Sequence, residues 1–195
     1  ITLEKRIPSQ AGLGGGSADA AAVLHGLNEL TGAALPMEEL LALGLRVGAD
    51  VPFCLVGGIC LAKGVGEILS PAPPMIPCFL VISKPPVGVS TADAFRRADA
   101  RMDGGHDYTG AVLRALETGD LVSLGTAIGN DFEDVTRLPE VERIKSLLIG
   151  AGAAGACMTG SGSAVFGLFA DEGTARCCAD RLKQEYPQTF FCIPE

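Results

Sequence analysis

Four glycines lie close together in the segment Gly12–Ser17, which reads Gly-Leu-Gly-Gly-Gly-Ser. Glycine adopts positive φ angles without steric cost and lets an anion approach the backbone. Leu24 and Leu27 follow at helical spacing, so we expect a helix with Ser17 as its N-cap. Free amides and the positive end of the helix dipole would then favour a phosphate over residues 14–17. A flexible turn before a capped helix is the alternative.

Two common nucleotide-binding loops do not fit this segment. A Walker loop needs Lys and then Ser or Thr after its last glycine, whereas this chain has Ser17 and Ala18. A Rossmann loop needs a strand with an acidic residue after its helix, and here a second helical segment follows. The segment therefore indicates a phosphate loop of another type.

Asp50 is the candidate for proton transfer, in the sequence Gly-Ala-Asp-Val-Pro-Phe. It follows a second helical segment, which has Pro36 near its first turn, so we expect Asp50 to lie on a loop. Pro52 biases Val51 toward an extended conformation, which would help to fix the direction of the carboxylate. An ordinary turn or capping aspartate is the alternative, and composition alone favours it.

A second glycine-rich segment, Met158–Phe166, precedes an apolar strand through Phe169. Its glycines would let this loop approach the first one closely, and a tight hairpin is the alternative. Thr91 and Phe95 are two further candidates for ligand binding. Thr91 could also be a helix N-cap, and Phe95 could stack on a base or lie in the core.

These segments together resemble the GHMP kinases. The triple glycine is most similar to that of the 4-diphosphocytidyl-2-C-methyl-D-erythritol kinases, since other branches usually carry Gly-Leu-Gly-Ser-Ser. The resemblance rests on residues 5–8, 11–21, 27–28, 47–53, 64–69, 85–91 with Phe95, and 158–166.

The resemblance implies a kinase that uses ATP and Mg²⁺ to phosphorylate the C2 hydroxyl of 4-diphosphocytidyl-2-C-methyl-D-erythritol, in the non-mevalonate pathway to isoprenoid precursors. Asp50 would accept the proton of that hydroxyl or orient it, and Ser17 would contact phosphate or metal. The implied nucleotide-binding residues are Pro8, Gly12, Leu13, Gly14, Gly15, Gly16 and Ser17. The implied substrate-binding residues are Val65, Thr91, Phe95, Gly160, Ser161 and Gly162, with Phe95 against the cytosine.

Two other functions stay open. One is another GHMP kinase of the homoserine or mevalonate type, and the other is a non-catalytic nucleotide-binding fragment. The chain begins at Ile1–Lys5, which reads as the middle of a strand, so we expect a preceding N-terminal segment. In the family that segment carries the catalytic lysine, so we expect the isolated chain to lack it.

Composition excludes several classes of protein. The 195 residues are 48% hydrophobic, enough to bury a core in one or two domains. A net charge of −8 without a basic cluster argues against nucleic-acid binding, and no apolar stretch is long enough for a membrane span. Seven scattered cysteines indicate reduced thiols, and only two histidines argue against a histidine metal centre. We expect a cytoplasmic monomer or weak homodimer that binds ATP and a small-molecule substrate.

The pattern of elements predicts an α+β fold. Prolines at 71–74 suggest a boundary between residues 1–72 and 73–195, and the alternation of elements makes residues 73–195 ferredoxin-like. The resemblance to the GHMP kinases implies that residues 1–72 are the end of a ribosomal-S5-domain-2-like domain. We expect a strand pair within 53–69 and an exposed turn at 104–107. Asn130–Glu133 is typical of helix-end capping or of turn contacts, and Thr109 or Asp120 could be a further cap. The other predicted strands are 78–84, 155–159, 164–169 and 189–193, and the predicted helices are 91–101, 109–118, 120–128, 139–149 and 171–185.

Overall fold

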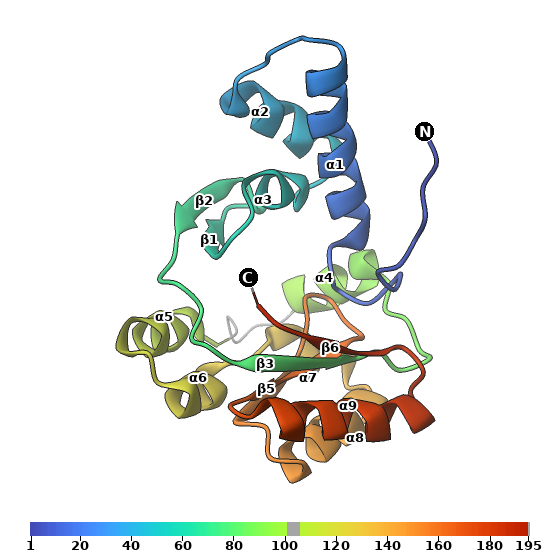
Figure 1. Cartoon of the computed structure of the whole chain (residues 1–195), viewed down its shortest axis with the longest axis vertical. Coiled ribbons are helices and arrows are strands. Elements are labelled where there is room, and N and C mark those ends of the chain that lie inside the picture. Colours follow the sequence, from blue (N-terminus) through green and yellow to red (C-terminus); the bar gives the residue numbers. More distant parts are fainter. Residues whose placement is uncertain (101–105, 195) are drawn as a thin grey trace. The chain divides into compact units, whose positions relative to one another are not determined.

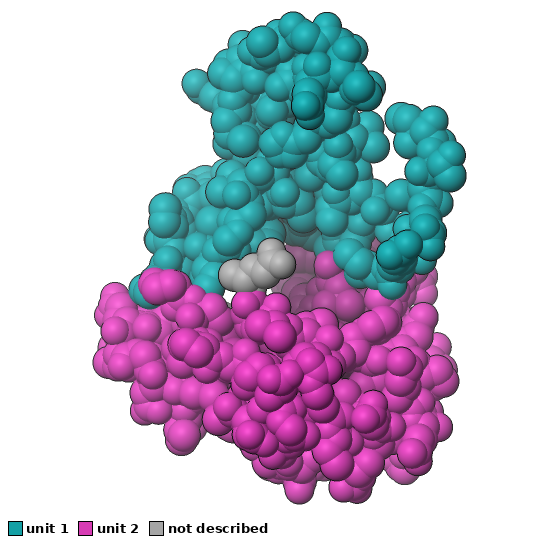
Figure 2. Space-filling view, in the orientation of Figure 1, with its two compact units in different colours: residues 1–7, 14–73 teal, residues 8–13, 74–195 magenta. Residues whose placement is uncertain are grey.

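The computed structural model describes residues 1–100 and 106–194. The turn expected at 104–107 and the end of the helix expected at 91–101 therefore lie partly outside the described residues. The chain forms two compact units, residues 1–7 with 14–73 and residues 8–13 with 74–195 (Figure 2). None of the described helices is long and apolar enough to span a membrane.

Unit 1 packs three helices with a β-hairpin (Figure 1). The helices are α1 (Gly15–Leu30), α2 (Met37–Val47) and α3 (Val51–Val56), and the antiparallel hairpin consists of β1 (Cys60–Lys63) and β2 (Ile68–Pro71). Ala21, Leu40, Val51 and Leu55 form its core. Helices α2 and α3 approach closely because Gly44 has no side chain; a Cβ there would lie 2.9 Å from Leu55 Cδ1.

Two predictions in unit 1 are wrong. Helix α1 begins at Gly15 with Gly14 as its N-cap, so Ser17 lies inside the first turn. Gly14 has a φ of 62°, and this left-handed conformation turns the chain into the helix three residues before the expected N-cap. Val51 begins helix α3 instead of being extended, whereas the strand pair expected within 53–69 is present at 60–63 and 68–71. Pro52 suits the first helical turn, where its missing N–H needs no partner and its fixed φ matches the helix.

Unit 2 is a four-stranded antiparallel sheet with six helices among its described residues. The strands are β3 (Phe79–Ser83), β4 (Gly155–Met158), β5 (Val165–Phe169) and β6 (Thr189–Cys192), in the order β4-β5-β3-β6. The helices are α4 (Thr91–Asp99), α5 (Thr109–Thr118), α6 (Leu121–Ala127), α7 (Asp131–Thr136), α8 (Pro139–Gly150) and α9 (Glu172–Glu185). This connectivity confirms the predicted ferredoxin-like arrangement. Helix α7 was not predicted as a helix of its own.

Alternating side chains of the sheet build two cores on its two faces. Val81 and Phe169 pack with α8 and α9, in the cluster that contains Ile144 and Leu182. Leu168 faces the other way and packs with residues of α5 and α6, such as Leu116 and Leu124. Helices α8 and α9 lie side by side below the sheet in Figure 1. Helices therefore pack on both faces of the sheet.

Two predicted caps are confirmed and two are shifted. Asp120 caps α6 by accepting from the Val122 amide at 3.0 Å, and Asn130 caps α7. Ser90 caps α4, so Thr91 is the first residue of that helix and not its cap. Thr109 likewise begins α5, with Tyr108 at the N-cap position.

All seven cysteines are free thiols, as predicted. Cys78, Cys157 and Cys178 are buried, whereas Cys177 is exposed on α9. Burial raises the pKa of the Cys157 thiol to about 12, and the negative charge of Glu133 adds to the effect. Because the thiolate is the reactive form, Cys157 is protected by both its burial and its pKa.

We expect iodoacetamide at about pH 8 to alkylate Cys177 and leave Cys157 unmodified in the folded protein. Peptide mass spectrometry measures the order of modification, and labelling in denaturant gives the control in which every cysteine reacts. Native labelling of Cys157 at the rate of Cys177 would contradict the core described above.

Candidate functional site

The N-terminus of α1 presents backbone N–H groups without side-chain caps. Its first backbone hydrogen bond runs from the Ala18 amide to the Gly14 carbonyl, at 2.9 Å. The amides of residues 15–17 precede that bond and have no partner within the helix. No side chain caps the helix, and its first turn carries no acidic residue. The positive end of the α1 dipole is therefore open to an anion.

The glycines at this helix end divide into packed and open positions. A Cβ on Gly15 would lie 2.8 Å from Ile7 Cγ2, so Gly15 is required for packing. A Cβ on Gly14 or Gly16 would meet nothing within 4 Å. Gly14 and Gly16 therefore leave space beside the free amides, and this space suits a phosphate group.

Lys5 adds a cation to this helix end. Its Nζ forms an ion pair with Asp19 and would lie 3.6 Å from a Cβ on Gly15. Asp19 alone would repel a phosphate bound nearby, and Lys5 offsets that charge. The sequence analysis used residues 5–8 only as part of the family resemblance, because an ion pair between residues 14 positions apart is not visible in a local pattern.

Asp50 lies at the N-cap position of α3, exposed and without a capping hydrogen bond. The charge of its carboxylate raises the pKa of Cys54, together with the larger effect of burial. The β1–β2 turn lies against the Asp50 turn, since a Cβ on Gly66 would be 2.9 Å from the Ala49 carbonyl oxygen. Val65, which is 73% exposed, stands in that turn. Unit 1 thus brings the segments of Asp50 and Val65 together.

In unit 2 the residues before α1 pack directly on the second glycine-rich loop. The Ala164 amide donates to the Ala11 carbonyl at 3.1 Å, and the Thr159 hydroxyl donates to the Gly12 carbonyl. A Cβ on Gly12 would lie only 1.9 Å from the Thr159 carbonyl oxygen, and Gly12 has a φ of +71°. The predicted close approach of these two loops is confirmed.

Four of the predicted substrate-binding residues meet beside this contact. The Thr91 and Ser161 hydroxyls are 3.0 Å apart, and Gly160 and Gly162 flank Ser161 with φ values of 50° and 92°. Phe95 lies one turn after Thr91 on α4 and packs edge-on against Phe132, with ring centroids 4.9 Å apart. Phe95 is 53% exposed, so its ring is not a core residue and part of it faces solvent.

The segment Asn130–Glu133 does more than cap α7. The Asn130 side-chain amide donates to the carbonyls of Met158 and Gly160, at 2.8 and 2.7 Å. Glu133 accepts from the Met158 amide at 2.7 Å and pairs with Lys145. The sequence analysis recognised the cap and missed these contacts, because their partners lie 12–30 residues away.

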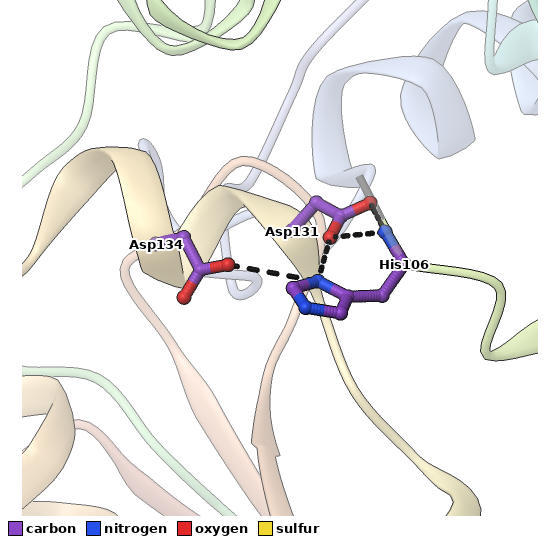
Figure 3. Close-up of side chains that lie close together, drawn as sticks. All are labelled: His106, Asp131 and Asp134. Carbon is purple, nitrogen blue, oxygen red and sulfur yellow. Dashed lines mark hydrogen bonds and ion pairs between the residues drawn. The ribbon is translucent and has the colours of Figure 1, made fainter. Parts of the chain in front are cut away.

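His106, Asp131 and Asp134 form a cluster at the start of α7 (Figure 3). His106 Nδ1 lies 2.9 Å from Asp131 Oδ1 and 3.7 Å from Asp134 Oδ2, and the His106 amide donates to Asp131 at 3.0 Å. In the described part of the chain this is the group of side chains whose ligand atoms lie close enough to hold a metal ion. The contacts of His106 with Asp131 and Asp134 fasten the segment at residue 106 to α7.

Family models match both parts of the chain. The model described as GHMP kinases N terminal domain matches residues 1–58, and the model described as GHMP kinases C terminal matches residues 112–188. A 4-diphosphocytidyl-2-C-methyl-D-erythritol kinase from Moorella thermoacetica is 47% identical, with 97% of this chain and 68% of that protein aligned. The chain belongs to the GHMP kinase family. This GHMP kinase chain spans 61% of the length of a second relative of the same name, from Lachnoclostridium phytofermentans, at 45% identity.

Solved structures agree with this assignment. A crystal structure of 4-(cytidine 5'-diphospho)-2C-methyl-D-erythritol kinase has a TM-score of 0.82 and 38% identity, and the match covers 98% of this chain and 69% of that one. A homoserine kinase from Cytophaga hutchinsonii has a TM-score of 0.81 at 22% identity, with 98% and 68% covered. The similarity to the homoserine kinase shows that this chain shares its fold.

We expect Gly12→Ala to lower the free energy of unfolding by about 3 kcal/mol, since a left-handed alanine is strained and its Cβ overlaps the Thr159 carbonyl. Gly32→Ala is the matched control, because Gly32 has a φ of +64° and open space around it. That control should cost about 1–2 kcal/mol. Urea unfolding measures both, and equal losses would show that the loop contact at Gly12 contributes nothing.

Proposed function

We propose that this GHMP kinase transfers the γ-phosphate of ATP to the C2 hydroxyl of 4-diphosphocytidyl-2-C-methyl-D-erythritol, a step in isoprenoid precursor biosynthesis. The open N-terminus of α1 supports the phosphoryl chemistry. The observation that carries the choice of substrate is the 45–47% identity to relatives named for this activity, over 90–97% of the chain. We place the activity in the full-length protein, because the chain spans 61–68% of those relatives.

The nucleotide is proposed to bind along the glycine segment, from Pro8 and Gly12–Leu13 to Gly14–Ser17. Backbone amides of residues 15–17 would donate to phosphate oxygens, and the open positions at Gly14 and Gly16 leave room for them. Lys5 would balance the charge of Asp19 beside the phosphates. The Ser17 hydroxyl is the proposed protein contact for phosphate or Mg²⁺, whose contribution when bound is to neutralise phosphate charge.

Asp50 is the proposed proton acceptor. As the substrate hydroxyl oxygen bonds to the γ-phosphorus, its proton passes to the Asp50 carboxylate, and the bond from the γ-phosphorus to the β–γ bridging oxygen breaks to release ADP. An exposed carboxylate without a capping hydrogen bond is free to accept that proton. The turn at Ala49 and Gly66 restrains the backbone on which this carboxylate stands.

The family resemblance supplies the residues proposed to bind the substrate, which are Val65 and, within unit 2, Thr91, Phe95, Gly160, Ser161 and Gly162. Thr91 and Ser161 offer neighbouring hydroxyls for its polar groups. The half-exposed Phe95 ring offers a face on which a cytosine can stack. Gly160 and Gly162 leave the backbone around Ser161 accessible to a ligand.

We also propose a cytoplasmic protein, monomeric or weakly dimeric, whose partners are these two small molecules. The net charge of −8 supports the absence of nucleic-acid binding. The proposed domains are residues 1–72 and 73–195.

The function is tested with Asp50→Asn in the full-length protein. We expect kcat to fall about 10²- to 10⁴-fold, because the amide keeps the shape of the side chain and cannot accept the proton. Coupled ADP release with the cytidyl substrate measures kcat. Asp120→Asn is the control that removes a carboxylate from the cap of α6 and should leave kcat unchanged. Full activity of Asp50→Asn would refute the assigned role.

Gly14→Ala tests the phosphate cradle separately. Its Cβ would enter the open space beside the free amides, so we expect KM for ATP to rise about tenfold or more through the loss of charged hydrogen bonds. Gly32→Ala is again the matched control, since the φ values of Gly14 and Gly32 are +62° and +64° and neither has a neighbour within 4 Å. Similar KM values for the two variants would place the triphosphate elsewhere.

A further inference from the structure

Asn130 uses every hydrogen-bonding group of its side chain. Its Oδ1 accepts from the Phe132 amide at 2.9 Å, which caps α7. Its Nδ2 donates to the Met158 carbonyl at 2.8 Å and to the Gly160 carbonyl at 2.7 Å. A side-chain amide has two N–H donors, and here the two donors hold the carbonyls on either side of Thr159.

Capping alone does not require an asparagine. Asp120 and Asp171 cap α6 and α9 of the same unit with carboxylates, and aspartate is as good an N-cap as asparagine. At position 130, however, a carboxylate would face two carbonyl oxygens with no hydrogen to donate. The need for asparagine at position 130 therefore comes from its two hydrogen bonds to the loop and not from its capping of α7.

The bond to Gly160 fixes the direction of the next amide. The Gly160–Ser161 peptide is planar and trans, so its C=O and N–H point in opposite directions. Because the carbonyl points to Asn130, the Ser161 N–H points away from α7. The Ser161 side chain is held in turn by the Thr91 hydroxyl, at 3.0 Å.

Neighbouring contacts hold the start of the same loop. Glu133 accepts from the Met158 amide while Asn130 binds the Met158 carbonyl, so both backbone groups of Met158 are bonded to the first turn of α7. Lys145 pairs with the partly buried Glu133 carboxylate and fixes it in turn. Met158 is thus anchored at the start of the loop. The bond from Asn130 to the Gly160 carbonyl then fixes the backbone conformation at Gly160, which a glycine would otherwise leave variable.

We propose that Asn130 is a positioning residue for substrate binding: it orients the Gly160–Ser161 peptide so that the Ser161 amide and hydroxyl face the phosphate-acceptor substrate. The inference rests on the proposed function for the identity of that substrate. The orientation of the loop by Asn130 does not depend on it.

The test is Asn130→Asp in the full-length protein, with Asn28→Asp as the matched control. The Asn28 side chain also donates to a backbone carbonyl and accepts from a backbone amide, both of Leu35, and it lies in unit 1. Hydrogen exchange of the peptide covering residues 158–163 is measured first, without ligand. We expect at least about tenfold faster exchange in Asn130→Asp and no change in Asn28→Asp, because the variant loses two donors to this loop.

Steady-state kinetics then separates positioning from a general loss of structure. We expect KM for the cytidyl substrate to rise about tenfold or more in Asn130→Asp, with KM for ATP unchanged. Unchanged loop exchange would overturn the proposal, and so would faster exchange with an unchanged KM for the cytidyl substrate. Absence of turnover in the wild-type protein would instead refute the proposed function, while the exchange comparison would still decide whether Asn130 holds the loop.

Discussion

The contact between Gly12 and the Thr159 carbonyl is the constraint on which the arrangement of the two glycine-rich segments in unit 2 depends. Two chain segments almost 150 residues apart meet there backbone to backbone, because a side chain at position 12 has no room. The Ala11–Ala164 hydrogen bond continues the contact as a short ladder. Glycine at this position is thus dictated by packing, whereas at Gly14 and Gly16 it leaves open space beside free amides. One glycine-rich segment therefore serves two physical purposes.

The loop that Gly12 contacts is also held from the other side. Helix α7 is short and has no fully buried residue, yet its first turn binds the loop through Asn130 and Glu133, and it supports Phe95 through Phe132. Polar contacts of this kind are directional, so they fix orientation where apolar packing would only bring surfaces together. The sheet beneath supplies the stability, and α7 supplies the geometry of the loop.

The sequence predicts the large elements of this fold well, because their signals are local. The apolar strands that became β3 and β5 and the patterned helices α8 and α9 agree with their predicted ranges within a few residues. Predictions failed where a single backbone angle or proline decided the outcome. Gly14 moved the start of α1, and Pro52 lies in the first turn of α3, which begins at Val51 where an extended residue was expected.

The candidate site was predictable to a lesser degree. The sequence analysis named Thr91 and Ser161 as candidates one by one. It could not predict their contact, because the two residues are 70 positions apart and only the fold brings them together. The roles of Lys5 and Asn130 depend on partners that no local pattern reveals. The roles of Asp50, Val65 and the nucleotide-binding glycines, and the domain limits at 72 and 73, stay predictions.

The most direct measurement is the position of the new phosphate after incubation of the full-length protein with ATP, Mg²⁺ and one alcohol at a time. Phosphorus NMR would compare 4-diphosphocytidyl-2-C-methyl-D-erythritol, homoserine and mevalonate as acceptors. Our account predicts a phosphate monoester at the C2 hydroxyl of the cytidyl compound and no product from the other two. Phosphorylation of homoserine or mevalonate instead, or ATP binding without transfer to any of the three, would contradict it.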